Sequence, residues 1–281
     1  MSRYAILEQI KQLDPVKDHH RIIYLAGAYE TPWLTTRALE FALFRTYAVP
    51  SIAKLLDQTG QFYHHGQRRY DDTAILIAEI TEHGYDSERG RAALRRMNQM
   101  HGRYRISNDD FLYVLSTFIF EPLRWTSRFG WRQPIQVEKE AMYYFWREVG
   151  KRMNIKNIPP SYEAFEQFNI AYEQANFCYS DASHRVAEAT IQVFLSWYPA
   201  PLRPLIREAI YALMDDPLRW AFGFPKPATV MRIMAEGTLK LYGKTIRWMP
   251  ARKTPYLYTQ HHRHRSYPTG YQLEKLGVDH R

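Results

Sequence analysis

Apolar residues recur at intervals of three and four along almost the whole chain of 281 residues. This spacing places them on one face of a helix, as in helices that pack against a core. No segment shows the alternation of apolar and polar residues, bounded by turn residues, that indicates a half-buried strand. The pattern predicts an all-α fold with helices at residues 3–13, 34–46, 50–58, 68–83, 87–103, 109–121, 135–152, 161–177, 183–197, 203–214 and 227–241.

Helix boundaries are marked by residues that start or break helices. Ser107, followed by Asp110, has the form of a capping box in front of an apolar run. Prolines at 159–160, 199–201 and 225–227 separate the later helices. No internal repeat or low-complexity linker interrupts the pattern. We therefore expect one helical domain over residues 1–281, with a loop-rich tail from about residue 243 onward.

The composition limits the class of protein. A hydrophobic content of 46% with 24% charged residues is typical of a globular chain and not of a disordered one. The single cysteine, Cys178, excludes an internal disulfide and a Cys-rich metal centre, and we expect it to be a small buried apolar residue. No signal peptide or membrane-spanning run is recognisable, so we expect a cytoplasmic protein.

The net charge is +9, because 38 Lys and Arg residues exceed 29 Asp and Glu residues. An excess of this kind favours nucleic acid or an anionic membrane surface as a partner. The basic residues are dispersed and no nucleic-acid-binding signature accompanies them, so we expect no nucleic-acid partner. Peripheral contact with a membrane remains open. The tract 261–265 is expected to be part of a solvated basic tail.

One histidine lies on an apolar helix face. Leu94, Met97, His101 and Tyr104 fall on the same side of one helix. Two interpretations remain: a core histidine whose nitrogens are both hydrogen-bonded, or a ligand of a metal or haem iron. His184, which begins a later apolar helix, is a second-choice ligand.

An arginine and a threonine share a face of the preceding helix. Arg69 and Thr73 are four residues apart, and aliphatic residues continue the same face. Burying both side chains requires a partner, which is either a carboxylate such as Asp72 or a bound polar ligand. Motifs for nucleotides, P-loops, zinc proteases, hydrolases and di-iron centres are absent from the sequence.

Several segments follow one another in an order that resembles the MpaB/rubber-oxygenase family, which includes the latex-clearing proteins. The similarity extends from about Tyr4 to Gly277, and the run that begins at His101 is its most specific part. The segments are RTYAVPSIAKLLDQTGQF (45–62), RRYDDT (68–73), HGRYRISNDDFLYVLSTFIFEPLRW (101–125), GWR (130–132), MYYFWREVGKRMNIKNIP (142–159) and YPTGYQLEKLG (267–277).

The resemblance implies an all-helical domain with a globin-like core that binds one haem b (iron protoporphyrin IX) through a single proximal histidine. The family has an Arg and a Thr on one helix turn and the haem histidine on the next helix. This order implies that His101 is the proximal iron ligand and that Arg69 and Thr73 line the haem pocket. The implied activity is a haem-dependent oxygenase that uses O₂ to cleave a C=C bond in an isoprenoid or other lipid-like chain. Its partners would be O₂ and an apolar, unsaturated small molecule or prenyl chain.

The sequence departs from the family pattern at the distal side of the iron. The rubber-cleaving branch has a Lys just before the Thr, where this chain has Asp72, which we expect to act as a catalytic proton carrier beside Arg69 and Thr73. The catalytic Glu of that branch has no counterpart, and the nearest positions hold Ala53 and Asp57. Aromatic residues are expected to help wall the pocket, namely Phe111, Tyr113, Phe118 and Phe120.

Two other functions remain open at this point. One is a haem protein without turnover, such as a gas sensor, electron carrier or haem store, in which His184 or a Lys supplies a second axial ligand. The other is a basic helical scaffold without a cofactor.

Overall fold

The computed structural model describes residues 2–277, which form helices and loops without a β-strand among them. The all-α prediction is confirmed. The elements are α1 (Ala5–Ile10), α2 (His19–Tyr24), η1 (Leu25–Glu30, a π-helix), α3 (Pro32–Thr46), α4 (Pro50–Thr59), α5 (Gln61–His64), α6 (Gly66–His83), α7 (Glu88–His101), α8 (Asn108–Phe129), α9 (Gln136–Arg152), α10 (Tyr162–Asn176), α11 (Asp181–Ser196), η2 (Ala200–Leu202), α12 (Arg203–Leu213), α13 (Asp216–Ala221), α14 (Thr229–Trp248), α15 (Tyr258–His261) and η3 (Leu273–Lys275).

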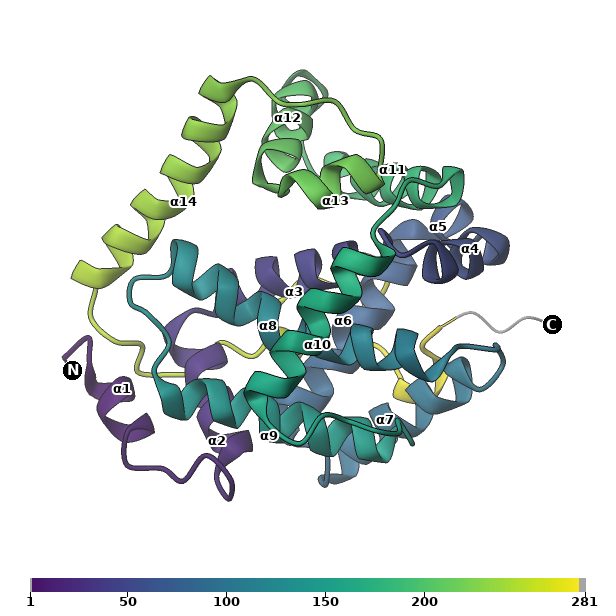
Figure 1. Ribbon diagram of the computed structural model, residues 1–281. Coiled ribbons are helices and arrows are strands. Elements are labelled where there is room, and N and C mark those ends of the chain that lie inside the picture. Colours follow the sequence, from purple (N-terminus) through teal and green to yellow (C-terminus); the bar gives the residue numbers. More distant parts are fainter. Residues whose placement is uncertain (1, 278–281) are drawn as a thin grey trace.

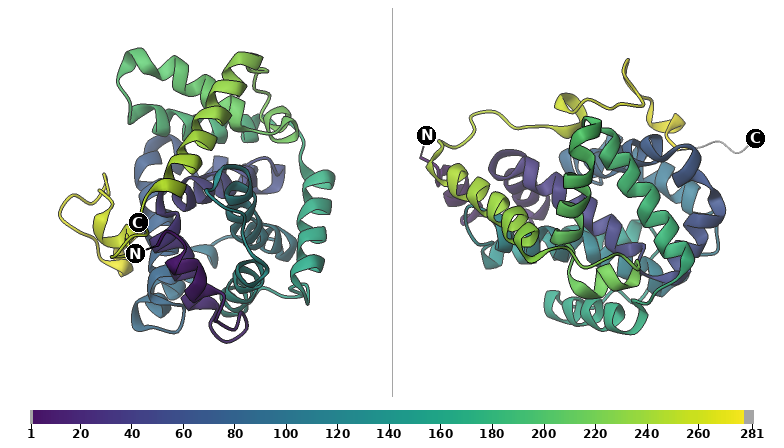
Figure 2. Two further views of the ribbon diagram at one scale, coloured as in Figure 1. Left: turned by 90° about the vertical axis from the view of Figure 1, so that its left-hand side faces the viewer. Right: turned by 90° about the horizontal axis from the view of Figure 1, so that it is seen from above.

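Helix α8 is the centre of the packing. It contacts α3, α9, α10 and α14, while α6 packs against α7 as an antiparallel hairpin. Figure 1 shows α11, α12 and α13 above this core, with α14 running down the left edge of the molecule. In the right-hand view of Figure 2, the segment after α14 begins on the side of the molecule where the N-terminus lies. It then runs along the outside of the helices to the opposite side.

The expected helix boundaries are confirmed at several joints. The Ser107 hydroxyl accepts a hydrogen bond from the Asp110 backbone N–H at 3.0 Å, and α8 begins at the next residue, Asn108. The three proline clusters fall in the connections before α10, α12 and α14. Three lengths were predicted wrongly, because α1 spans only Ala5–Ile10 and not 3–13, α8 continues through Pro122 to Phe129 and α14 continues to Trp248. The loop-rich tail therefore begins after residue 248 and not at 243.

Short elements were not predicted. These are α2 with the π-helix η1, and the single turns α5, α13 and α15. An apolar period needs two or more turns to be recognised, and elements of four to six residues do not supply them.

One further expectation is wrong, and another holds only in part. Cys178 is exposed, because in the connection between α10 and α11 it is the neighbouring Phe177 that packs against the core. His264 is only 7% exposed, although a solvated tail was expected for residues 261–265. Its ring packs edge-on against Tyr271 and against Tyr258, so aromatic neighbours hold this part of the tail onto the domain.

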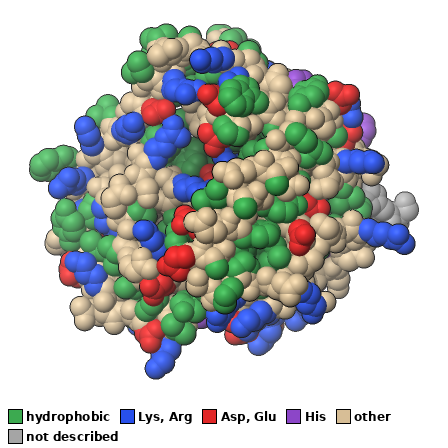
Figure 3. All heavy atoms as spheres, in the orientation of Figure 1, with side chains coloured by type: hydrophobic (Ala, Val, Ile, Leu, Met, Phe, Trp, Pro, Cys, Tyr) green, Lys and Arg blue, Asp and Glu red, His purple; other side chains and the backbone are tan. Residues whose placement is uncertain are grey.

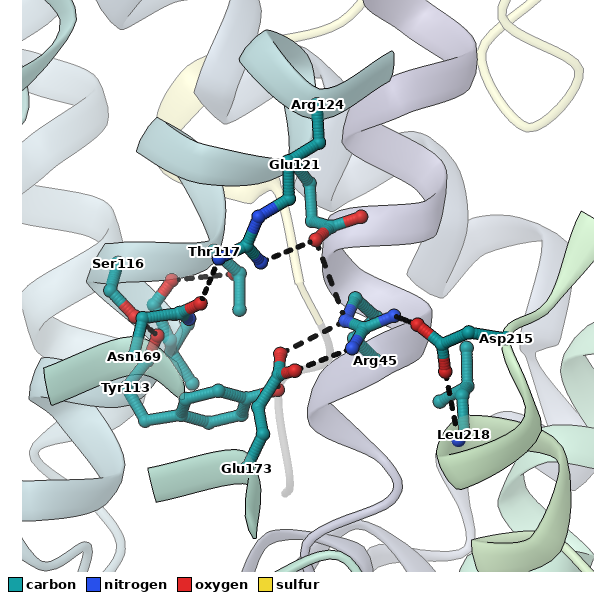
Figure 4. A network of polar contacts seen from close by, with 11 residues as sticks. Arg45, Tyr113, Ser116, Thr117, Glu121, Arg124, Asn169, Glu173, Asp215 and Leu218 are labelled. Carbon is teal, nitrogen blue, oxygen red and sulfur yellow. Dashed lines mark hydrogen bonds and ion pairs between the residues drawn. The ribbon is translucent and has the colours of Figure 1, made fainter. Parts of the chain in front are cut away.

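A buried ion-pair network joins four helical segments (Figure 4). Arg45 of α3 donates from Nε to Glu173 of α10 at 2.9 Å, and its guanidinium also pairs with Asp215 at the N-cap of α13. Glu121 of α8 lies 3.5 Å from Arg45 and is shared with Arg124 at 3.0 Å. Glu121 and Glu173 are largely buried together with the guanidinium, so these two carboxylates need it as a counter-ion, whereas Asp215 is about half exposed.

None of the helices within residues 2–277 combines the length and the apolar character that crossing a bilayer requires.

Candidate functional site

The α6–α7 hairpin carries the three residues predicted to form the site, which are Arg69 and Thr73 on α6 and His101 on α7. The two helices are antiparallel and are joined by a short turn at residues 84–87, so the end of α7 lies opposite the start of α6. Gly90 permits the tight turn, since a Cβ there would lie 2.0 Å from the Gly84 carbonyl oxygen. This pairing places His101, the last residue of α7, close enough to Arg69 for its charge to act on the imidazole, and Arg69 in turn bonds Thr73.

His101 has the environment of a ligand and not of a satisfied core histidine. Its Nδ1 is buried and has no hydrogen-bond partner among the described residues. Burial, together with the positive charge of Arg69, lowers the pKa of His101 to about 4. The imidazole is therefore neutral at pH 7, which is the form that binds iron. The structure therefore does not support the interpretation of His101 as a core histidine with both ring nitrogens hydrogen-bonded.

Arg69 and Thr73 form the polar part of this site. The Arg69 guanidinium donates to the Thr73 hydroxyl at 2.8 Å, and that hydroxyl donates to the Arg69 carbonyl at 3.0 Å. The guanidinium also lies 5.8 Å from the centre of the Phe62 ring. Of the two kinds of partner considered for Arg69, the carboxylate of Asp72 does not form an ion pair with it and lies 4.0 Å from Arg68 instead.

Aromatic side chains complete the site. Phe111 of α8 meets His101 edge-on at 5.5 Å between ring centres. Tyr47, at the end of α3, packs on Phe62 at 5.3 Å, and burial raises the pKa of Tyr47 to about 12, an increase that Arg69 opposes. Sequence reasoning missed Tyr47 and Phe62. Both lie inside a segment that carries the family resemblance, which is the only signal that pointed to them.

Asp72 is engaged by the C-terminal tail. Its carboxylate is completely buried and accepts a hydrogen bond from the Tyr267 hydroxyl, while Arg68 lies 4.0 Å from the other oxygen. Burial raises the pKa of Asp72. Its partners differ from those of Arg69 and Thr73, and they tie the tail to α6.

Neither of the positions nearest to the family's catalytic Glu supplies a free acid to this site. Ala53 is fully buried, and Asp57 is ion-paired with Arg185 at 2.6 Å, which lowers the pKa of Asp57. The Nδ1 of His184 is 2.7 Å from the Phe222 carbonyl oxygen and its ring lies against Phe224, so the contacts of His184 are away from His101.

The four aromatic residues expected in the pocket divide into two groups. Phe111 contacts His101 and Phe118 lines a cavity described below. Tyr113 donates to Glu173 at 3.1 Å, and Phe120 packs on Phe165 in the core.

A largely apolar cavity of about 150 Å³ lies further along the same helices. Its walls include Leu39 of α3, Thr81 of α6 and Phe118 of α8. Thr81 is two helical turns beyond Thr73, a rise of ~12 Å along α6. Among residues 2–277, no three His, Cys, Asp or Glu side chains gather in a way that would hold a metal ion.

Comparison with known proteins identifies the family. Residues 31–248 match the family model described as ER-bound oxygenase mpaB/B′/rubber oxygenase, catalytic domain, which is more than half of the chain. The chain belongs to the MpaB/rubber-oxygenase family. The matched range contains Arg69, Asp72, Thr73 and His101.

Curated relatives in fungi support the same family membership. The ER-bound oxygenase mpaB′ of Penicillium brevicompactum is 32% identical over 71% of this chain and 51% of its own length. The ER-bound oxygenase mpaB of Penicillium roqueforti is 32% identical over 68% of this chain and 70% of its own length. The chain thus aligns with about half of the first relative and 70% of the second.

Proposed function

We propose that this chain is a haem b-dependent oxygenase that cleaves a C=C bond in an isoprenoid or other lipid-like chain. The observation that carries the proposal is the neutral imidazole of His101, whose buried Nδ1 has no partner among residues 2–277, in a family of oxygenases. A buried polar atom left unpaired is costly, and it is expected where a ligand completes the site. When bound, haem would supply the iron centre that activates O₂.

The residues around His101 have distinct roles in this proposal. His101 would hold the iron, and the globin-like core expected from the family would be built around the α6–α7 hairpin and α8. Arg69 is held by its hydrogen bond to Thr73, so its remaining N–H groups could bind a haem propionate or donate to the O₂ substrate, and the Thr73 hydroxyl could donate there once it releases the Arg69 carbonyl. The rings of Tyr47, Phe62 and Phe111 would exclude water from the reacting groups.

Asp72 is better suited to positioning than to proton transfer. Its carboxylate is held by Tyr267 and faces Arg68, so it fixes the tail against α6 on the helix that carries Arg69 and Thr73. We therefore assign the polar contacts at the reacting atoms to Arg69 and Thr73.

The apolar cavity supports the choice of substrate. It is lined by residues of α6 and α8, the helices that also carry Thr73 and Phe111, and its walls are mostly hydrophobic. An apolar chain held there would extend toward His101. O₂ and the unsaturated chain are the two substrates, and adding both oxygen atoms across the cleaved double bond gives two carbonyl ends.

The absorption spectrum of protein reconstituted with haem tests the proposal. Wild type should show a Soret band that His101→Ala loses or shifts, whereas His184→Ala should leave it unchanged, because the contacts of His184 are with Phe222 and Phe224 and not with the residues around His101. A wild type that binds no haem would refute the proposal. Consumption of O₂ with an unsaturated isoprenoid would distinguish the oxygenase from a haem protein without turnover.

The outer surface of α14 supports contact with a membrane, where such substrates would partition. The side of α14 that faces away from the protein has five large apolar residues in a row along its length, and Lys240, Lys244 and Arg247 lie beside them. Figure 3 shows hydrophobic and basic side chains next to one another along this edge. The apolar residues, between 56% and 88% exposed, are Val230, Ile233, Met234, Leu241 and Trp248.

We propose that this surface binds peripherally to anionic bilayers, since an apolar stripe with basic flanks suits the interface. In co-sedimentation with phosphatidylcholine–phosphatidylserine vesicles, the double variant Leu241→Asn/Trp248→Ser should bind about tenfold more weakly than wild type. The matched control is Val16→Asn/Tyr179→Ser, which changes two similarly exposed residues elsewhere. Equal loss in both variants, or a dimer that only the α14 variant dissociates, would contradict the proposal.

A further inference from the structure

The cavity is bounded by two irregular helical segments. On one side is the π-helix η1, whose small residues Ala26, Gly27 and Ala28 leave space where longer side chains would fill it. On the other side α8 contains Pro122, which cannot donate a backbone hydrogen bond to the Phe118 carbonyl one turn earlier. Departures of this kind from regular helix often occur at binding sites.

Two residues that line the cavity each have a buried polar atom without a partner among the described residues. Glu30, which is 5% exposed, has an unpaired Oε1, and Trp131 has an unpaired indole Nε1. One is a hydrogen-bond acceptor and the other is a donor. Trp131 belongs to the GWR segment, and Gly130 allows the turn that places it there, since a Cβ on Gly130 would lie 2.4 Å from the Thr126 carbonyl oxygen.

The charges around these two atoms are balanced. Arg132 donates to Glu30 at 2.8 Å and to Glu138 at 2.7 Å, and Arg3 donates to the Glu30 carbonyl at 2.9 Å. Two guanidinium groups thus accompany two carboxylates at this end of the cavity. A charged ligand would upset this balance in a buried place, whereas a neutral hydroxyl would not.

The size of the cavity restricts the apolar part of a ligand. A space of about 150 Å³ accommodates a group of the size of a benzene ring. We propose that the cavity binds a neutral alcohol or phenol, with its apolar body against Leu39 and Phe118 and its hydroxyl paired with Glu30 and Trp131. The hydroxyl would donate to the Glu30 carboxylate and accept from the Trp131 indole N–H.

In the proposed oxygenase, this site would recognise the polar end of the substrate while the unsaturated chain extends toward His101. That role rests on the proposed function, but the binding itself does not. A failure of the oxygenase proposal can be distinguished from a failure of this binding site, because His101→Ala should lose the haem spectrum and still bind the alcohol or phenol.

Calorimetric or ligand-observed NMR titration with phenol and with toluene tests the site. These probes have the same ring and differ in whether they carry a hydroxyl or a methyl group. Phenol should bind wild type saturably and about tenfold more tightly than toluene, the difference that roughly one hydrogen bond makes. Trp131→Phe keeps the ring and removes the donor, so the preference for phenol should fall while toluene binding is retained.

A variant that fills the cavity gives a second test. Gly27→Leu places a side chain in the cavity and should abolish the binding of both probes. Gly237→Leu is its matched control, because a side chain at this exposed position in α14 meets nothing within 4 Å. The proposal is overturned if neither probe binds wild type, if Gly27→Leu still binds both, or if phenol and toluene bind equally well.

Discussion

Replacing His101 by leucine should make the apoprotein more stable while it abolishes haem binding. The buried Nδ1 of His101 has no partner in the part of the chain that the structure describes, and leaving such an atom unpaired typically costs ~1–3 kcal/mol. Leucine has a similar volume and no polar atom, so His101→Leu removes this cost. At pH 7.5 the free energy of unfolding of the apoprotein should therefore rise by about that amount.

The same substitution should reduce sensitivity to acid. His101 has a pKa of about 4 in the folded protein and an ordinary value near 6.5 when unfolded. As the pH falls from 6.5 to 4, the unfolded chain binds a proton that the folded protein does not bind. Stability is lost over that window, and at 1.36 kcal/mol per pKa unit the total is ~3 kcal/mol. The leucine variant has no such contribution.

Urea unfolding of both apoproteins, followed by circular dichroism at several pH values, measures the two effects. The quantity of interest is the difference between wild type and variant, because the other histidines are common to both. That difference should grow by ~3 kcal/mol between pH 6.5 and pH 4. If the two proteins lose stability in parallel, His101 is not the buried, neutral group described here, and its assignment as an iron ligand loses its structural basis.

Two further predictions concern stability. Arg45→Met should cost ~3–5 kcal/mol because it leaves buried carboxylates without a counter-ion, whereas Arg128→Met, which breaks a half-exposed pair, should cost less than ~1 kcal/mol; equal costs in denaturant unfolding would contradict the role of the network. Tyr267→Phe removes the hydrogen bond to Asp72, so it should cost ~1–3 kcal/mol and speed proteolysis of the tail. An unchanged cleavage rate would show that the tail is held by other contacts.

The sequence was sufficient for the long helices and insufficient for the contacts between them. Helices of ten or more residues were predicted because their apolar faces repeat over several turns. The extension of α8 beyond Pro122 was missed because proline usually ends a helix, and here the packing of Leu123, Trp125 and Phe129 continues it. The burial of these side chains in the core outweighed the tendency of proline to end a helix.

The candidate site shows the same limit. The spacing of Arg69 and Thr73 predicted a shared face, and the structure confirms it with a direct hydrogen bond. Spacing could not tell that Asp72 faces the tail, because its partner Tyr267 is 195 residues away in the chain. For the same reason the π-helix and the GWR segment, which meet at one cavity, were recognised neither as elements of a site nor as neighbours.

The unpaired atoms connect these observations physically. Arg45 is buried and paired with carboxylates on both sides of its guanidinium, so the fold alone accounts for it. His101, Glu30 and Trp131 are buried with an atom that has no partner among residues 2–277, and folding alone gains nothing from such atoms. Unpaired atoms occur elsewhere too, as at His264 and at Oδ2 of Asp72, but these three lie at the two proposed binding places, one beside Arg69 and one around the apolar cavity. Haem at the first place and the polar end of the substrate at the second would each supply a missing partner, which is why we place the iron at the first and the substrate's polar end at the second.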